Sequence, residues 1–176
     1  MLIIKNNIIF VGHMGSGKTS IGKILAKSLN IEFVDTDNKI EKISAMTINN
    51  FFSKYGEKEF RSFEEKVILD ILNKKSTTVI ALGGGSFQNK NVRSLILEKN
   101  ISIWLKCSLS ILVNRLKNSR RRPLLDNIDI KNKILLLDKE RRDNYKKANI
   151  EYDVSKKLKK NINKELVEII TKINEN

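Results

Sequence analysis

A glycine-rich octapeptide, residues 12–19, carries the clearest chemical signal in the sequence. It has the form G-x-x-x-x-G-K-[ST], ends in Lys18 and Thr19, and lies between the apolar run 8–11 and the amphipathic run 20–26. In that setting backbone N–H groups surround an anion, the lysine reaches outer phosphates and the threonine hydroxyl ligates Mg²⁺. A turn that merely joins strand to helix does not require these fixed positions. We therefore predict that the chain binds a nucleoside triphosphate.

Two aspartates, Asp35 and Asp37, follow the second apolar run, 31–34. Open α/β sheets bind ligands at the carboxyl ends of their strands, so we expect one carboxylate to face a metal ion and the other the substrate. A structural alternative stays open, in which Asp37 only caps the helix that begins at Asn38. The third apolar run, 78–82, lacks the acid of a second nucleotide motif, which makes Asp35 the better metal candidate.

Three further features have both a structural and a chemical interpretation. Gly83, Gly84 and Gly85 follow the third apolar run and form either a flexible loop or a close backbone approach to a ligand. Arg61 is either a solvated helix residue or a residue whose guanidinium group binds a carboxylate. The basic cluster 117–125, which contains Arg122, is a solvated loop, a nucleic-acid patch or a lid that closes an arginine onto the transferring phosphate.

The elements that position these residues follow from the hydrophobic pattern. Five apolar runs predict strands at 8–11, 31–34, 78–82, 101–105 and 150–154. Amphipathic runs predict helices after the glycine-rich loop, from 38, over 47–52, up to about 72, and over 89–99, 109–116, 131–145 and 161–173. We find no repeat, linker or second domain. The prediction is one α/β domain over residues 1–176, in which Cys107 packs and His13, the single histidine, has no chemical role.

Composition limits the possible partners. The chain of 176 residues has 34 Lys and Arg against 20 Asp and Glu, a net charge of +14. Because this charge is spread along the chain, it favours small anionic substrates over a nucleic acid. One cysteine agrees with a reducing compartment, and no run suggests a secretory signal or a membrane span. We expect a cytoplasmic monomer with no nucleic-acid or membrane partner.

Six features in this order resemble the shikimate kinase family over nearly the whole chain. They are residues 12–19, 35–37, 56–61, 83–85, 122–125, and Arg141 four residues before Tyr145. The resemblance implies a three-layer P-loop kinase fold, in which helices flank a five-stranded parallel sheet of order 2-3-1-4-5, as in nucleoside monophosphate kinases. It also implies a mobile lid at about 117–127 and substrate-binding helices at about 37–72. The implied reaction moves the γ-phosphate of ATP to the 3-hydroxyl of shikimate, in chorismate and aromatic amino acid biosynthesis.

The resemblance also assigns roles to individual residues. Arg61 and Arg141 would clamp the shikimate carboxylate, and Asp37 would orient and deprotonate the attacking hydroxyl. Backbone amides of Gly83, Gly84 and Gly85 would contact shikimate, and Phe52 and Phe60 would form an apolar wall. Lys18 and Arg122 would neutralise the transferring phosphoryl group, while Thr19, and Asp35 through coordinated water, would hold Mg²⁺. The implied ATP contacts are Gly12, Gly15, Ser16, Gly17, Lys18, Thr19, Ser20 and Arg122.

Departures from the family pattern leave some assignments open. Asp143 stands where many relatives have proline, so the second clamp is either Arg141 or Arg142. Met14 replaces a loop proline, and no arginine motif around residues 155–157 identifies the adenine pocket. Two rival functions remain: another small-molecule kinase of this architecture, such as a gluconate kinase, and an ATP-regulated nucleic-acid-binding module. The module would need aromatic stacking positions, and aromatic residues make up only 6% of the chain.

Overall fold

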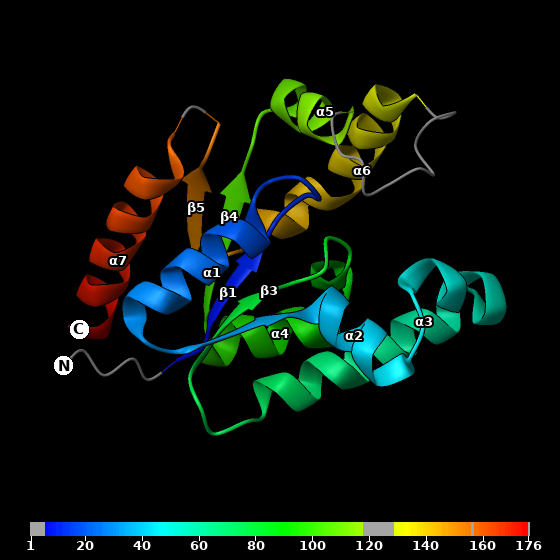
Figure 1. Cartoon of the computed structure of the whole chain (residues 1–176), viewed down its shortest axis with the longest axis horizontal. Helices are drawn as coiled ribbons and strands as arrows, with labels where there is room; N and C mark the ends of the chain where they lie inside the picture. The colour runs from blue at the N-terminus through cyan, green and yellow to red at the C-terminus, as the bar shows by residue number, and fades with distance from the viewer. Residues whose placement is uncertain (1–5, 118–128, 156, 176) are drawn as a thin grey trace.

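A five-stranded parallel sheet forms the centre of the protein (Figure 1). The computed structural model describes residues 6–117, 129–155 and 157–175. The strand order is β2-β3-β1-β4-β5, which confirms the predicted order. The strands are β1 (Ile8–Val11), β2 (Glu32–Asp35), β3 (Thr78–Ala81), β4 (Ile101–Lys106) and β5 (Ile150–Asp153). All five coincide with the predicted runs to within one residue at each end.

The central strand β1 is buried on both faces, as expected of a parallel sheet covered by helices. Its four residues are at most 1% exposed, and alternate side chains point to opposite faces of the sheet. Ile8 and Phe10 enter one hydrophobic core, whereas Ile9 and Val11 enter the other. The chain therefore forms three layers, with the sheet between two groups of helices.

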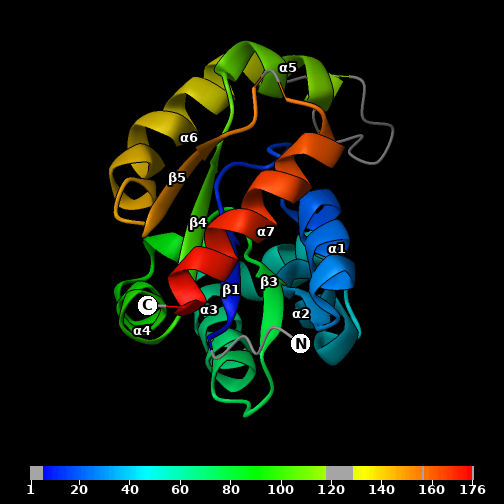
Figure 2. The same cartoon turned by 90° about the vertical axis from the view of Figure 1, so that its left-hand side faces the viewer.

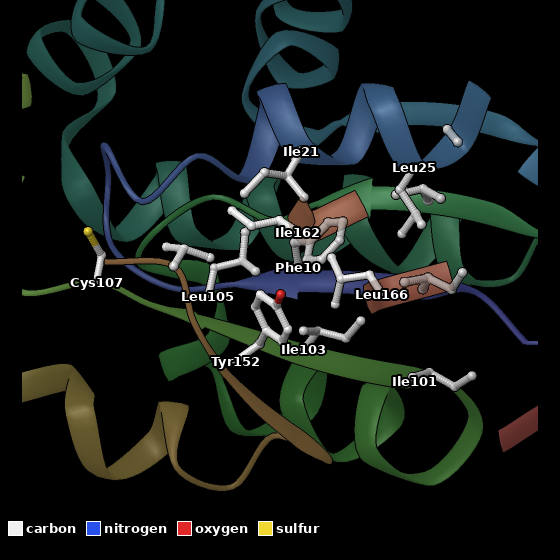
Figure 3. Packing of buried hydrophobic residues seen from close by; sticks show 14 of the residues in the cluster. Phe10, Ile21, Leu25, Ile101, Ile103, Leu105, Cys107, Tyr152, Ile162 and Leu166 are labelled. Atoms are coloured by element: carbon white, nitrogen blue, oxygen red, sulfur yellow. The ribbon is translucent and has the colours of Figure 1, made fainter. Parts of the chain in front are cut away.

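Helices α1 (Lys18–Leu29) and α7 (Lys159–Glu175) lie side by side over one face of the sheet (Figures 1 and 2). Figure 3 shows how Ile21 and Leu25 of α1 and Ile162 and Leu166 of α7 pack around Phe10. Helix α5 (Leu109–Lys117) extends this core toward the carboxyl ends of the strands. This packing fixes the amino end of α1 directly after β1, where the glycine-rich loop lies.

The other face is covered by helices α3 (Ile48–Leu72) and α4 (Lys90–Lys99) and by the end of α6 (Ile130–Tyr145). Helix α3 breaks at Gly56, where φ is 80° and ψ is 172°, so the two predicted helices of this region join at one sharp bend. A short 3₁₀ turn, Ser86–Gln88, follows the three glycines and was not predicted. Together with α2 (Thr36–Ser44), these elements surround the carboxyl ends of β2 and β3.

Two further predictions concern the lid and the absence of a membrane span. The predicted lid, residues 117–127, lies outside the described residues except for Lys117, and so does Arg122. Within the described ranges, none of the helices has the length and apolar character needed to span a bilayer.

Candidate functional site

A cavity of about 830 Å³ opens at the carboxyl ends of β1, β2 and β3. It brings together most of the predicted site residues from segments far apart in the sequence. The predicted residues that line it are Gly15, Gly17, Lys18, Thr19, Ser20, Asp35, Asp37, Arg61, Gly83, Gly84, Gly85 and Arg141. Phe52 and Phe60 contribute to its wall. Ligand sites at the carboxyl ends of parallel strands are the rule in open α/β sheets.

The glycine-rich loop wraps around the ammonium group of Lys18. Gly12, Gly15 and Gly17 have φ values of 134°, 80° and 105°, a region in which residues with a Cβ are strained. The Lys18 Nζ donates to the carbonyl oxygens of Gly12 and His13, at 2.8 and 2.9 Å. Since α1 begins at Lys18, the positive end of this helix and the lysine face the same cavity. The arrangement suits a polyphosphate.

Asp35 links the loop to the second strand. The Thr19 hydroxyl donates to Asp35 Oδ2 at 2.6 Å, and the backbone N–H of Asn38 donates to Asp35 Oδ1 at 3.2 Å. Asp35 is thus the residue that caps α2, so the alternative in which Asp37 serves as the cap is wrong. Asp37 lies in the first turn of the helix and lines the cavity.

Each of the three glycines after β3 lies against one of the predicted substrate-binding side chains. A Cβ built on Gly83 would be 2.6 Å from Asp37 Oδ1, and one on Gly85 would be 3.1 Å from both terminal nitrogens of Arg61. A Cβ on Gly84 would be 3.4 Å from a terminal nitrogen of Arg141. The missing side chains therefore let one carboxylate and two guanidinium groups converge on the same short stretch of backbone.

Arg61 is held by two glutamates to which the sequence assigned no role, and it lies beside the predicted rings of Phe52 and Phe60. Its Nη1 donates to Glu64 at 2.7 Å, while Glu57 is 3.4 Å away and 71% exposed. The Glu64 side chain is 5% exposed and also accepts a hydrogen bond from Ser86 Oγ at 2.6 Å. The Arg61 guanidinium carbon lies 5.8 and 5.3 Å from the ring centroids of Phe52 and Phe60. The i, i+3 spacing to Arg61 was the one sequence signal for Glu64.

Arg141 and Tyr145 lie one turn apart on helix α6, and both side chains approach Gly84. The Tyr145 hydroxyl donates to the Gly84 carbonyl oxygen, and the residue is fully buried. Burial raises the pKa of Tyr145 to about 12, against the smaller opposing effect of Arg141. Arg142 faces elsewhere and pairs with Asp138 at 2.7 Å. Of the two arginines, only Arg141 is among the described residues that line the cavity.

Further residues of the cavity were missed from the sequence. Arg115 lines it next to the glycine-rich loop and donates to the Gly15 carbonyl oxygen at 3.0 Å. Lys159 and Glu41 also line it, and Glu41 accepts from the backbone N–H of Ile48 at 2.9 Å. These residues belong to no recognisable motif, so no local pattern separated them from ordinary surface charges.

Oxygen donors for a divalent cation are present beside the loop. Among the described residues no cluster of three or more His, Cys, Asp or Glu side chains could hold a metal ion by itself. The adjoining Thr19 hydroxyl and Asp35 carboxylate nevertheless fit Mg²⁺, which keeps several waters and takes only one or two protein oxygens when substrate phosphates complete its shell.

Comparisons with known proteins identify the family of the chain. The shikimate kinase family model matches residues 14–171. A shikimate kinase of Bartonella quintana is 44% identical over 146 residues, covering 83% of this chain and 69% of the relative. A shikimate kinase of Brucella canis is 39% identical over 163 residues, covering 93% of this chain and 81% of the relative.

Solved structures give the same result. The shikimate kinase from Acinetobacter baumannii in complex with shikimate has a TM-score of 0.86 and 30% identity, covering 94% of this chain and 92% of that one. A gluconokinase from Sinorhizobium meliloti 1021 has a TM-score of 0.65 and 18% identity, covering 98% of this chain and 95% of that one. At this identity the comparison shows only that the two proteins share a fold. With its sequence matches, its sheet order and its phosphate-binding loop taken together, the chain belongs to the shikimate kinase family of ATP-dependent kinases.

Proposed function

We propose that this chain transfers the γ-phosphate of ATP to the 3-hydroxyl of shikimate, giving shikimate 3-phosphate and ADP, within one kinase domain spanning residues 1–176. One observation carries the proposal. Arg61, Arg141 and Asp37 converge on the three glycines after β3, in the same cavity as the phosphate-binding loop. Shikimate carries one carboxylate and several hydroxyl groups on a carbon ring. The two guanidinium groups are complementary to the carboxylate, and Asp37 is complementary to a hydroxyl.

The substrate half of the cavity would fix shikimate at its two polar ends. Arg61 and Arg141 would hold the carboxylate through charge-assisted hydrogen bonds. The amides of Gly84 and Gly85 would face the ligand, whereas the Gly83 amide, also predicted to do so, already donates to Thr36 Oγ1. Asp37 would accept a hydrogen bond from the attacking hydroxyl and take its proton as the bond to phosphorus forms. The Phe52 ring is half-buried and borders the cavity, where it would pack on the carbon ring.

The nucleotide half would stabilise charge on the transferring group. The backbone amides of the glycine-rich loop would cradle the phosphates, with Ser16 and Ser20 among the contacts. The Lys18 ammonium, already directed into the loop, would neutralise negative charge on the phosphoryl oxygens. Arg122, which lies outside the described residues, would add a second cation from the lid.

Thr19 and Asp35 are the residues that would hold Mg²⁺, Asp35 through a coordinated water. Held there, the ion would supply positive charge that stabilises the transferring phosphoryl group. The hydrogen bond between the two side chains keeps both oxygens at the edge of the loop, beside the position expected for the outer phosphates. The remaining coordination positions would be filled by water and by the nucleotide.

Replacing Thr19 with valine tests this metal site. Valine matches threonine in shape but lacks the hydroxyl, so the Mg²⁺ concentration for half-maximal turnover rises at least roughly tenfold. Thr19→Ser keeps the hydroxyl and is the matched control, with an expected change of less than about threefold. The measurement is turnover against free Mg²⁺ at saturating ATP and shikimate. Equal Mg²⁺ dependence of Thr19→Val and the parent protein contradicts the assignment of Thr19.

The choice of shikimate over related substrates is tested by ADP release against a panel. Shikimate, gluconate, nucleoside monophosphates and water are compared in one coupled assay with ATP and Mg²⁺. We expect shikimate to give the highest kcat/KM by at least roughly 10³-fold, because a site built to hydrogen-bond one hydroxyl pattern rejects others strongly. Gluconate is the informative competitor because it also has a carboxylate and hydroxyls, but no ring to pack on Phe52. Preferential turnover of gluconate overturns the proposal.

We extend the proposal to partners and compartment. The chain acts as a cytoplasmic monomer, without nucleic acid or a membrane as partner. The single cysteine suits a reducing compartment. A salt titration with RNA tests the rival function: tight binding that weakens steeply with salt, without turnover of shikimate, favours a nucleic-acid-binding module.

A further inference from the structure

A buried polar cluster joins the phosphate-binding loop to α6, and the proposed reaction does not use it directly. The His13 Nε2 lies 2.9 Å from Asp138 Oδ1. The Arg142 Nε and a terminal nitrogen lie 2.8 and 2.7 Å from Asp138 Oδ2. His13 and Asp138 are 6% and 8% exposed, although 125 positions separate them in the sequence. Neither residue is among those that line the cavity, and their contact joins the loop to the helix.

The cluster is chemically complete, with both carboxylate oxygens of Asp138 paired. Burial lowers the pKa of His13, an effect that nearby Arg141 and Lys18 reinforce and that Asp138 opposes. The neutral ring therefore donates its Nε2–H to one oxygen of Asp138, while Arg142 donates to the other. Burying a carboxylate is costly unless both of its oxygens have partners. Arg142 belongs to α6 itself, whereas His13 comes from the loop, so loss of the His13 donor is expected to shift the helix relative to the loop.

The face of α6 that contacts His13 also carries the proposed carboxylate clamp. The Tyr145 ring lies edge-on to the His13 ring, with centroids 5.1 Å apart and planes at 89°. Asp138 and Tyr145 are two turns apart on the helix, so His13 contacts it at two levels. Arg141 lies between these levels and approaches Gly84. The position of its guanidinium group thus depends on how α6 is held against the loop.

We propose that His13 and Asp138 form a positioning pair, which ties the phosphate-binding loop to α6 and thereby holds Arg141 over Gly84. The pair touches neither reacting group; it acts through Arg141. This inference rests on the proposed function, in which Arg141 binds the shikimate carboxylate. It assigns a role to a histidine that the sequence pattern left without one.

A double-mutant cycle tests the pair. His13→Leu and Asp138→Ala each raise the KM for shikimate by roughly 3- to 100-fold, the range of coupling between residues in contact, and the double variant is no worse than the worse single variant. The dissociation constant of ATP changes less than about threefold, because the loop backbone and Lys18 remain. His13→Gln retains an N–H donor and recovers most of the lost affinity. Asp143→Ala is the matched control, since Asp143 is on the same helix, 86% exposed and paired only with Lys146 in the described contacts.

Tryptophan fluorescence distinguishes a specific loss of the pair from a general loss of α6 packing. Trp104, the single tryptophan, stacks on Tyr145 with ring centroids 5.9 Å apart, so its fluorescence reports whether α6 remains packed. Should His13→Leu unfold, the comparison of His13→Gln with the parent protein still measures the pair. An unchanged KM for shikimate, additive losses in the double variant, or a loss confined to ATP binding overturns the inference. If Arg141→Ala also has no effect, the clamp role of Arg141 fails; if Arg141→Ala is strongly impaired, only the positioning role of the pair is lost. Absence of shikimate turnover by the parent protein would overturn the proposed function itself.

Discussion

Arg141→Ala lowers kcat/KM for shikimate by roughly 30- to 1,000-fold and leaves the dissociation constant of ATP unchanged, the expected result for loss of one side of a charge pair. Arg141 is half-buried and lines the cavity, and one of its terminal nitrogens lies close to Gly84. Alanine leaves the substrate carboxylate with Arg61 alone. Because binding energy far from the reacting atoms also orients them, kcat falls together with affinity.

The adjacent arginine provides the control for this prediction. Arg142 belongs to the same helix and carries the same charge, but it is directed to Asp138 and its side chain is 45% exposed. Arg142→Ala is expected to cost less than about tenfold, since His13 still holds Asp138. Steady-state kinetics with shikimate and calorimetric titration with ATP measure both variants. A larger loss in Arg142→Ala than in Arg141→Ala would assign the clamp to Arg142.

The fold followed from the sequence because its local and long-range signals agree. The central strands β1, β3 and β4 are short apolar runs that are buried on both faces, whereas the edge strands β2 and β5 are partly exposed. All five appear within one residue of their predicted bounds. The ends of the helices were harder to predict, because a capping residue is defined by the hydrogen bond that its side chain accepts from the first turn of the helix. Asp35 and Asp37 are both acceptable caps by type, and only the contact of Asp35 with the Asn38 N–H distinguishes them.

The site could be predicted only where residues form motifs. The six motifs of the family supplied Arg61, Asp37 and the glycines. Asp37 and the glycines lie next to strand ends, whereas Arg61 lies within α3. The supporting residues have no such signal: Glu64 resembles any helix glutamate until its burial and its bonds to Arg61 and Ser86 are seen. His13 likewise depends on Asp138, which is remote in sequence. Contacts of this kind arise from tertiary packing, which no local pattern encodes.

Asp37→Asn is expected to reduce kcat by about 10²- to 10⁴-fold, the range for loss of a general base. Asparagine fills the same volume and still accepts a hydrogen bond from a hydroxyl, so the dissociation constant of shikimate should change less than about tenfold. The Asp37 Oδ1 lies beside Gly83, whose N–H donates to Thr36 Oγ1 at 2.8 Å, so the first turn of α2 and the end of β3 are fixed together. The variant therefore keeps its geometry and loses only the charge.

Glu41→Gln is the matched control, because it removes another carboxylate of the same cavity one turn further along α2. Its backbone partner, Ile48, is still bound by the amide oxygen, and kcat should remain within about threefold. The size of the Asp37→Asn loss then separates two roles. In a loose phosphoryl transition state the hydroxyl proton leaves late, and a loss near 10²-fold indicates that Asp37 mainly orients the hydroxyl. A loss near 10⁴-fold indicates proton removal in the rate-limiting step, and a loss below about threefold excludes Asp37 from both roles.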